Sequence, residues 1–170
     1  MALLLSSALL AVAPLAAHAE VLGNEESVQI LGDDPITVTA ALDPQAAQAQ
    51  LIVSSFKYVP RNQGLEVSFV VASGEVIPTR QVTLQRPLLE DIHITRKDGD
   101  VRHIPVVPLD ICVGATRMQV DFRLYRRENF KPTMTLGAAQ TAELIRRGNI
   151  LDTSRSFIQT PDCQPAAARS

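Results

Sequence analysis

The chain has 170 residues, a net charge of -2 at pH 7 and two cysteines. This slightly acidic balance argues against a nucleic-acid binder whose affinity depends on neutralising phosphates. Once the leader described next is removed, about 150 residues remain, which suits a single domain with its own core.

The N-terminus has the features of an export signal. An apolar run from Leu3 to Leu15 precedes Ala17-His18-Ala19, which fits the small-x-small pattern of a signal-peptidase site. The run is shorter than the roughly 20 apolar residues of a membrane-spanning helix. We therefore predict a signal peptide over 1–19, a single domain over 20–163 and a disordered tail over 164–170. The protein is expected to be periplasmic or secreted, with no stable membrane insertion after cleavage.

The first part of the mature chain predicts short strands joined by turns. Apolar and polar residues alternate over 65–71 and 80–85, and clusters of Pro, Gly and Asn separate the runs. Between the early strands, residues 43–50 fit two structures. Asp43 could cap a short helix with Pro44 at its first position, or the Ala/Gln-rich segment could be a linker.

A β-hairpin is predicted within residues 87–112, with its turn at Lys97-Asp98-Gly99-Asp100. If the loop has three residues, with Gly99 left-handed, Ile92 faces Ile104 and His93 faces His103. In a two-residue loop the histidines would point to opposite sides of the sheet. We favour the three-residue register because it pairs apolar with apolar residues, with the three isoleucines Ile92, Ile94 and Ile104 on one face.

After the hairpin, one strand and one helix are clear. Residues 118–125 alternate strictly, which places Met118, Val120, Phe122 and Leu124 in the core. A helix is predicted over 137–147, with Thr135 as its N-cap, Gly148 at its end and an apolar stripe along one side. The stripe consists of Ala138, Ala142, Leu144 and Ile145.

The two cysteines, Cys112 and Cys163, both lie in the exported part of the chain. In an oxidising compartment two thiols in one small domain usually pair, so we predict a disulfide between them. It would attach the C-terminal segment to the body of the domain.

A local group of basic residues interrupts the acidic background, with Asp121 and Glu128 among them. It is either the solvated face of a strand or a surface for a partner. Its members are Arg117, Arg123, Arg126, Arg127 and Lys131.

No nucleophile, phosphate-loop or zinc-protease motif occurs in the sequence. We therefore expect no catalytic residue, no bound cofactor and no enzymatic activity. One alternative chemistry remains, because in the favoured register Asp91, His93 and His103 share a face of the hairpin. Two imidazoles and a carboxylate suit zinc or copper, although exposed polar residues on a solvent face would follow the same pattern.

The order of features resembles the invasion-associated locus B family of exported bacterial proteins. The matching pieces are Pro87-Leu88-Leu89, Asp98-Gly99, Cys112 and the segment from Leu136 to Gly148. The chain departs from that family at Ala115, where a second cysteine is usual. The resemblance implies a periplasmic β-sandwich with an accessory role at the cell envelope.

Together these patterns predict a mostly-β domain, an immunoglobulin-like antiparallel β-sandwich with one short C-terminal helix. The expected function is that of an accessory or assembly protein that binds another envelope or secreted protein. The alternative is a periplasmic protein that binds copper or zinc through the histidine pair.

Overall fold

The computed structural model describes residues 19–73, 80–127 and 133–163. The predicted signal peptide, apart from Ala19, and the predicted tail lie outside this part of the chain. None of the helices in the described part is long and apolar enough to span a bilayer.

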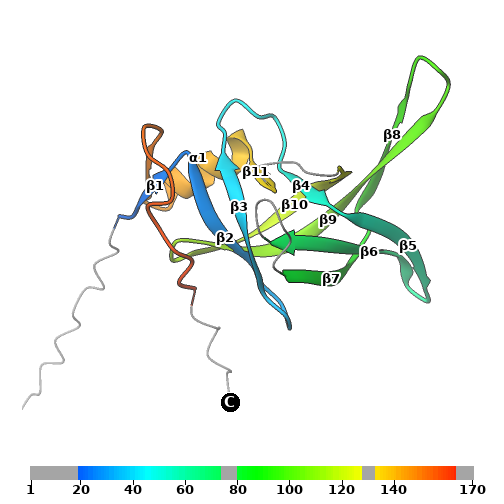
Figure 1. Ribbon diagram of the computed structural model, residues 1–170, viewed down its shortest axis with the longest axis horizontal. Helices are drawn as coiled ribbons and strands as arrows, with labels where there is room; N and C mark the ends of the chain where they lie inside the picture. Colours follow the sequence, from blue (N-terminus) through cyan, green and yellow to red (C-terminus); the bar gives the residue numbers. More distant parts are fainter. Residues whose placement is uncertain (1–18, 74–79, 128–132, 164–170) are drawn as a thin grey trace, which may run out of the picture.

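The described residues form mainly strands, as predicted, with one short helix (Figure 1). The elements in chain order are β1 (Val21–Gly23), β2 (Glu25–Ile30), β3 (Ile36–Leu42), β4 (Gln50–Val53), β5 (Ser55–Arg61), β6 (Gly64–Ser73), β7 (Arg80–Pro87), β8 (Glu90–Thr95), β9 (Val101–Val113), β10 (Thr116–Arg126), β11 (Met134–Leu136), α1 (Ala138–Arg146) and β12 (Ile150–Asp152).

The main sheet closes on itself. Its strands follow the order β10-β4-β11-β3-β2-β9, and β9 pairs again with β10. Strand β9 makes this closure because its 13 residues are long enough to pair β8 with its first half and both β2 and β10 with its second half. The mostly-β class is therefore confirmed, but the main sheet resembles a barrel and does not show the two separate sheets of an immunoglobulin-like sandwich.

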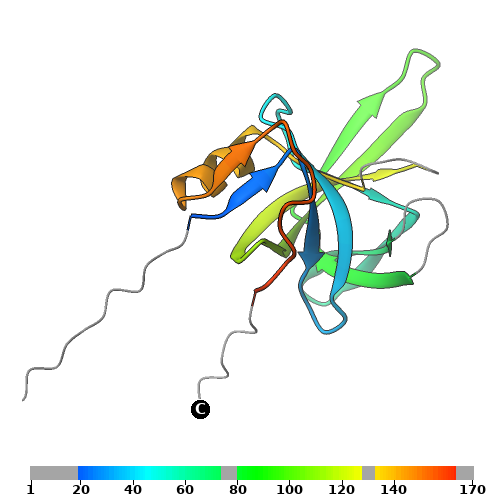
Figure 2. The same ribbon diagram turned by 60° about the vertical axis from the view of Figure 1, so that its left-hand side comes forward.

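A second sheet, β5-β6-β7, packs against the barrel and shares its core (Figures 1 and 2). Only Ser54 separates β4 from β5, so the chain passes directly from one sheet to the other. In β6 the alternate residues Val67, Phe69 and Val71 are fully buried. The predicted alternation in β10 is also confirmed, since Met118, Val120, Phe122 and Leu124 are all buried.

Helix α1 lies where the sequence places it, but its first turn differs from the prediction. Thr135 is not the N-cap, because it belongs to β11 and pairs with Ala41. Gly137 takes the N-cap position without a side-chain hydrogen bond. The buried side of the helix consists of Thr141 and Leu144, whereas Ile145 is 54% exposed.

The end of the helix and the C-terminal segment are both tied to the domain. Gly148 adopts a left-handed φ of +96° and its N–H donates to the carbonyl of Ile145, as a helix-ending glycine should. The disulfide between Cys112 and Cys163 is present, with sulfurs 2.07 Å apart. Fully buried Glu26 accepts hydrogen bonds from the N–H groups of Ile158 and Gln159, which fixes the same segment further.

Candidate functional site

Two groups of polar residues are held by neighbouring strands. The first is the loop after β3, residues 43–49, which we call the Asp43 loop. The second is the histidine hairpin, which we define as β8 and β9 with Asp91, His93 and His103 on one face.

The Asp43 loop begins where two strands end side by side. Strands β3 and β11 are parallel, with Leu42 opposite Leu136, so the two strands end side by side at the same end of the sheet. On its other side β11 pairs antiparallel with β4, the strand that follows the loop. The loop therefore starts on β3, passes the end of β11 and returns on the far side of it. Both of its ends are fixed by buried strands.

Backbone contacts hold this loop closely against the start of α1. The N–H of Asp43 donates to the carbonyl of Leu136 at 2.9 Å, and the N–H of Ala138 donates to the carbonyl of Ala46 at 2.8 Å. A Cβ on Gly137 would lie 2.6 Å from the Ala46 carbonyl oxygen, closer than atoms can approach. Glycine is therefore required at 137 for the loop to pack as it does.

The carboxylate of Asp43 is oriented locally and is half-exposed. Its Oδ1 accepts a hydrogen bond of 2.8 Å from the N–H of Gln45, and within the described residues Oδ2 has no hydrogen-bond partner. Residues 44 and 45 form a turn, so of the two structures allowed by the sequence the helix is wrong. The sequence signal for this site was the acid directly after an apolar strand. It was missed because Asp before Pro is equally typical of a helix cap.

The histidine hairpin has the three-residue loop that was favoured from the sequence. Gly99 has φ +89°, the N–H of Arg96 donates to the carbonyl of Asp100, and His93 faces His103 across the strands. The hairpin extends beyond the core, so Ile104 is buried while Ile94 is 47% exposed. In Figure 1 it projects from the end of the molecule opposite α1.

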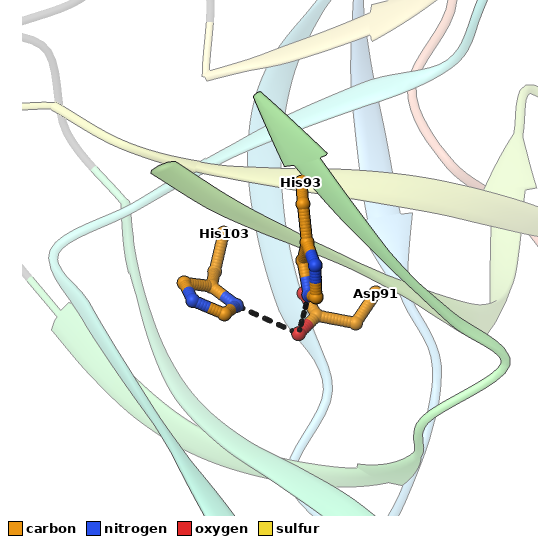
Figure 3. Close-up of side chains that lie close together, drawn as sticks. All are labelled: Asp91, His93 and His103. Atoms are coloured by element: carbon orange, nitrogen blue, oxygen red, sulfur yellow. Dashed lines mark hydrogen bonds and ion pairs between the residues drawn. The ribbon is translucent and has the colours of Figure 1, made fainter. Parts of the chain in front are cut away.

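One carboxylate oxygen joins the two histidines (Figure 3). Asp91 Oδ2 lies 2.9 Å from His93 Nε2 and 2.8 Å from His103 Nδ1. The hydroxyl of Tyr58, on β5, donates to the other oxygen of Asp91 at 2.8 Å. The ring centroids of the two histidines are 4.4 Å apart.

These contacts change the acidity of two groups. Partial burial of Asp91 favours its neutral form, but the hydrogen bonds from His103, His93 and Tyr58 outweigh that effect and hold the pKa of Asp91 below its ordinary value. Burial of Tyr58, together with its hydrogen bond to Asp91, raises the pKa of its hydroxyl far above the ordinary value. Asp91 is therefore ionised, and Tyr58 a neutral donor, at neutral pH.

The basic residues singled out in the sequence do not form one surface. Arg117 lies at the start of β10 and pairs with Asp110 at 3.7 Å, whereas Arg126 and Arg127 lie about 30 Å further along the strand direction. Lys131 lies outside the described residues. An open groove of about 550 Å³ lies near the end of β10 that carries Arg126 and Arg127. It is lined by Phe56, Tyr58, Arg96, Asp100, Val101, Arg102, His103, Arg126 and Arg127.

The family model described as "RimB-like: Retropepsin-like aspartic endopeptidase RimB" matches residues 21–162, nearly the whole described chain. The chain belongs to the RimB-like family. Membership corrects two expectations. The resemblance to the invasion-associated locus B family was wrong, since features such as an Asp-Gly turn and a helix ending in glycine occur in many folds. The expectation of no enzymatic activity is also overturned, because the RimB-like family is described by an endopeptidase.

A solved structure of a protein of unknown function (DUF785) from Legionella pneumophila has a similar fold to this RimB-like chain. The TM-score is 0.64 at 20% sequence identity, and the match covers 83% of this chain and 98% of that chain. At this identity the likeness concerns the fold alone. Among curated proteins, none matches the chain.

Proposed function

We propose that this protein is an exported endopeptidase of the aspartic type. In this proposal Asp43 supplies one reacting carboxylate, and Asp43 of a second copy supplies the other. The observation that supports it best is the placement of a partly exposed carboxylate at the end of two paired parallel strands, in a chain whose family is described as aspartic endopeptidases. The envelope or secreted protein predicted as a partner is then the substrate.

The chemistry requires two acids that act as a pair. In aspartic proteases two carboxylates about 3 Å apart share one proton, because like charges so close cannot both ionise. The ionised carboxylate takes a proton from a water molecule while the oxygen of that water attacks the peptide carbonyl carbon. The protonated member donates a hydrogen bond to the carbonyl oxygen, and the amine leaves with a proton when the C–N bond breaks.

Asp43 suits this role better than Asp91 or Glu26, two other acids that accept several hydrogen bonds. Asp91 already binds two histidines through one oxygen and Tyr58 through the other. Glu26 is completely buried and accepts backbone hydrogen bonds, so it cannot reach a substrate. One oxygen of Asp43 accepts a hydrogen bond from Gln45, and the other has no hydrogen-bond partner among the described residues.

A two-fold axis is the simplest source of the second carboxylate. In a symmetric dimer the same surface of each copy meets its equivalent, so a residue near the axis meets itself. The disulfide supports export, because such bonds persist in oxidising compartments such as the periplasm.

The first test measures hydrolysis of an unfolded, fluorescently labelled protein by the chain that begins at Glu20. Asp43→Asn keeps the acceptor for Gln45 but cannot share a proton, so we expect a loss of activity of about 100-fold or more. Asp33→Asn, which removes an exposed carboxylate from a turn, is the matched control and should retain full activity. Equal activity of the Asp43 variant and wild type would refute the role of Asp43. Failure of wild type to cleave at any acidity between about pH 3 and pH 8 would refute the function.

A mixing experiment tests the symmetric pair. When equal amounts of wild type and the Asp43→Asn variant are unfolded, mixed and refolded together, about one quarter of the dimers hold two Asp43 residues. Activity should then be about one quarter of that of wild type at the same total concentration, rather than the half expected of independent chains.

A further inference from the structure

The histidine hairpin has no part in the proposed peptidase chemistry, although its polar groups are the most convergent in the described part of the chain. We propose that it binds a divalent transition-metal ion, zinc or copper, through Asp91 Oδ2, His93 Nε2 and His103 Nδ1.

The donor atoms are of the right kind and are close together. Ligand atoms from the three residues all lie within 4.8 Å of one another. Imidazole nitrogen and carboxylate oxygen are common ligands of zinc, and imidazole also suits copper. In a tetrahedral site with bonds of about 2.0–2.2 Å, ligand atoms lie about 3.3 Å apart. The present separations of 2.8 and 2.9 Å need to open by less than 1 Å.

Neighbouring residues orient these ligands before any ion arrives. The strand register fixes His93 opposite His103, and Asp91 follows on the same face because it lies two residues before His93. The Tyr58 hydroxyl donates to Oδ1 of Asp91 and so leaves Oδ2 facing the two rings. A donor that holds the second oxygen of a metal-binding carboxylate is typical of metal sites in proteins.

The proposed metal site is open to solvent and has three protein ligands, and both features affect how strongly it binds an ion. The side chains of His93 and His103 are 56% and 46% exposed, so an ion can enter without local unfolding. Three protein ligands leave one tetrahedral position for water or another small ligand. The arginines of the adjacent groove oppose a cation, so binding should be weaker than in closed structural zinc sites.

The test is equilibrium dialysis of the tag-free chain against zinc ions and, separately, copper(II) ions, followed by measurement of bound metal. We expect about one ion per chain for wild type, and at least a tenfold weaker affinity for His93→Asn and for His103→Asn. Glu90→Gln removes a carboxylate from the same strand but from its other face, so it should bind like wild type. Tyr58→Phe should weaken binding by about tenfold without abolishing it.

A second measurement does not depend on any variant folding. Titration of wild type with zinc should shift the NMR signals of both histidine rings together and reach an end point at one equivalent. No ring shifts, or unchanged affinity in both histidine variants, would overturn the site. Neither result bears on Asp43, so the peptidase proposal stands or fails separately.

Discussion

Gly137 is a residue on which the packing of the Asp43 loop depends directly. It lies one residue after β11, and the carbonyl oxygens of Ala46 and Gln48 occupy the space where a side chain would start. These are backbone atoms, which cannot rotate away as the end of a flexible side chain could. Any substitution at 137 must therefore move the Asp43 loop.

We predict that Gly137→Ala destabilises the fold by about 1–3 kcal/mol, as overpacking does, and lowers peptidase activity further than this loss of stability explains. The matched control is Ala142→Gly in α1, which costs about 1 kcal/mol through helix propensity and should leave activity unchanged. Urea unfolding and peptide hydrolysis measure the two effects. An active and fully stable Gly137→Ala protein would contradict the packing of the loop.

The same residue scale shows why the sequence could suggest one site and not the other. The histidine cluster follows from local pattern alone, because a hairpin turn fixes register and register fixes which side chains share a face. The position of Asp43 depends on contacts of its loop with Leu136 and Gly137, which lie more than 90 positions later in the chain. No local pattern around Asp43 distinguishes a reacting acid from a turn or cap residue.

At the scale of elements, the disulfide attaches the C-terminal segment to β9. The disulfide closes a loop with a sequence separation of 51 between Cys112 and Cys163. Within that loop lie β10, β11 and α1, which include the strand that supports the Asp43 loop.

We predict that replacing both cysteines by alanine lowers the free energy of unfolding by about 4 kcal/mol, the chain-entropy estimate for a loop of this length. Urea unfolding of the oxidised wild type and the double variant measures the difference. A reductant should destabilise wild type by a similar amount and leave the double variant unchanged. If reduced and oxidised wild type unfold at the same urea concentration, the bond does not restrict the unfolded chain as this model requires.

A charge cluster at the end of α1 gives a pH dependence. Glu143 accepts hydrogen bonds from Arg146 and Arg147, which together lower the pKa of its carboxyl below the ordinary 4.5. Arg147 also donates to the carbonyl of Arg117 and so links the helix to β10.

Because the folded-state pKa of Glu143 is lowered, its stabilising effect is present above pH 4.5 and is lost as the pH falls through the lower folded value. We predict that Glu143→Gln is slightly less stable than wild type at neutral pH and that the difference disappears in acid. Thermal unfolding of both proteins across this range is the measurement. A difference that grows on acidification would show that the pKa of Glu143 is not lowered in the folded state.

Strands were predicted correctly from the sequence where apolar and polar residues alternate over several positions. Strand β10 and the hairpin were located correctly, because each has several alternating residues. Strand β11 was missed, since its three residues are too few to show a period. Closure of the barrel depends on this strand lying between β3 and β4, which is a long-range pairing without a local signal.

At the scale of the whole molecule, the two sites lie on different supports. The Asp43 loop lies where α1 begins, while the histidine hairpin projects from the end of the molecule opposite α1 (Figures 1 and 2). The Asp43 loop is hydrogen-bonded to Leu136 and Ala138 rather than to the hairpin, so we expect an ion at the hairpin to leave the loop in place.

Dilution can distinguish whether the dimer or the monomer is the active form of the proposed peptidase. If each active unit needs Asp43 from two copies, only the dimer is active, and the fraction of dimer falls with total concentration. We predict that hydrolysis per chain is constant at high concentration and then decreases in proportion to concentration below the dissociation constant of the dimer. Sedimentation at the same concentrations should show conversion of dimer to monomer over the same range. His103→Asn should follow the same curve, because the hydrogen bonds that hold the Asp43 loop do not involve His103. Activity per chain that stays constant while the protein sediments as a monomer would show that one copy suffices, and the second carboxylate would then have to come from the same chain.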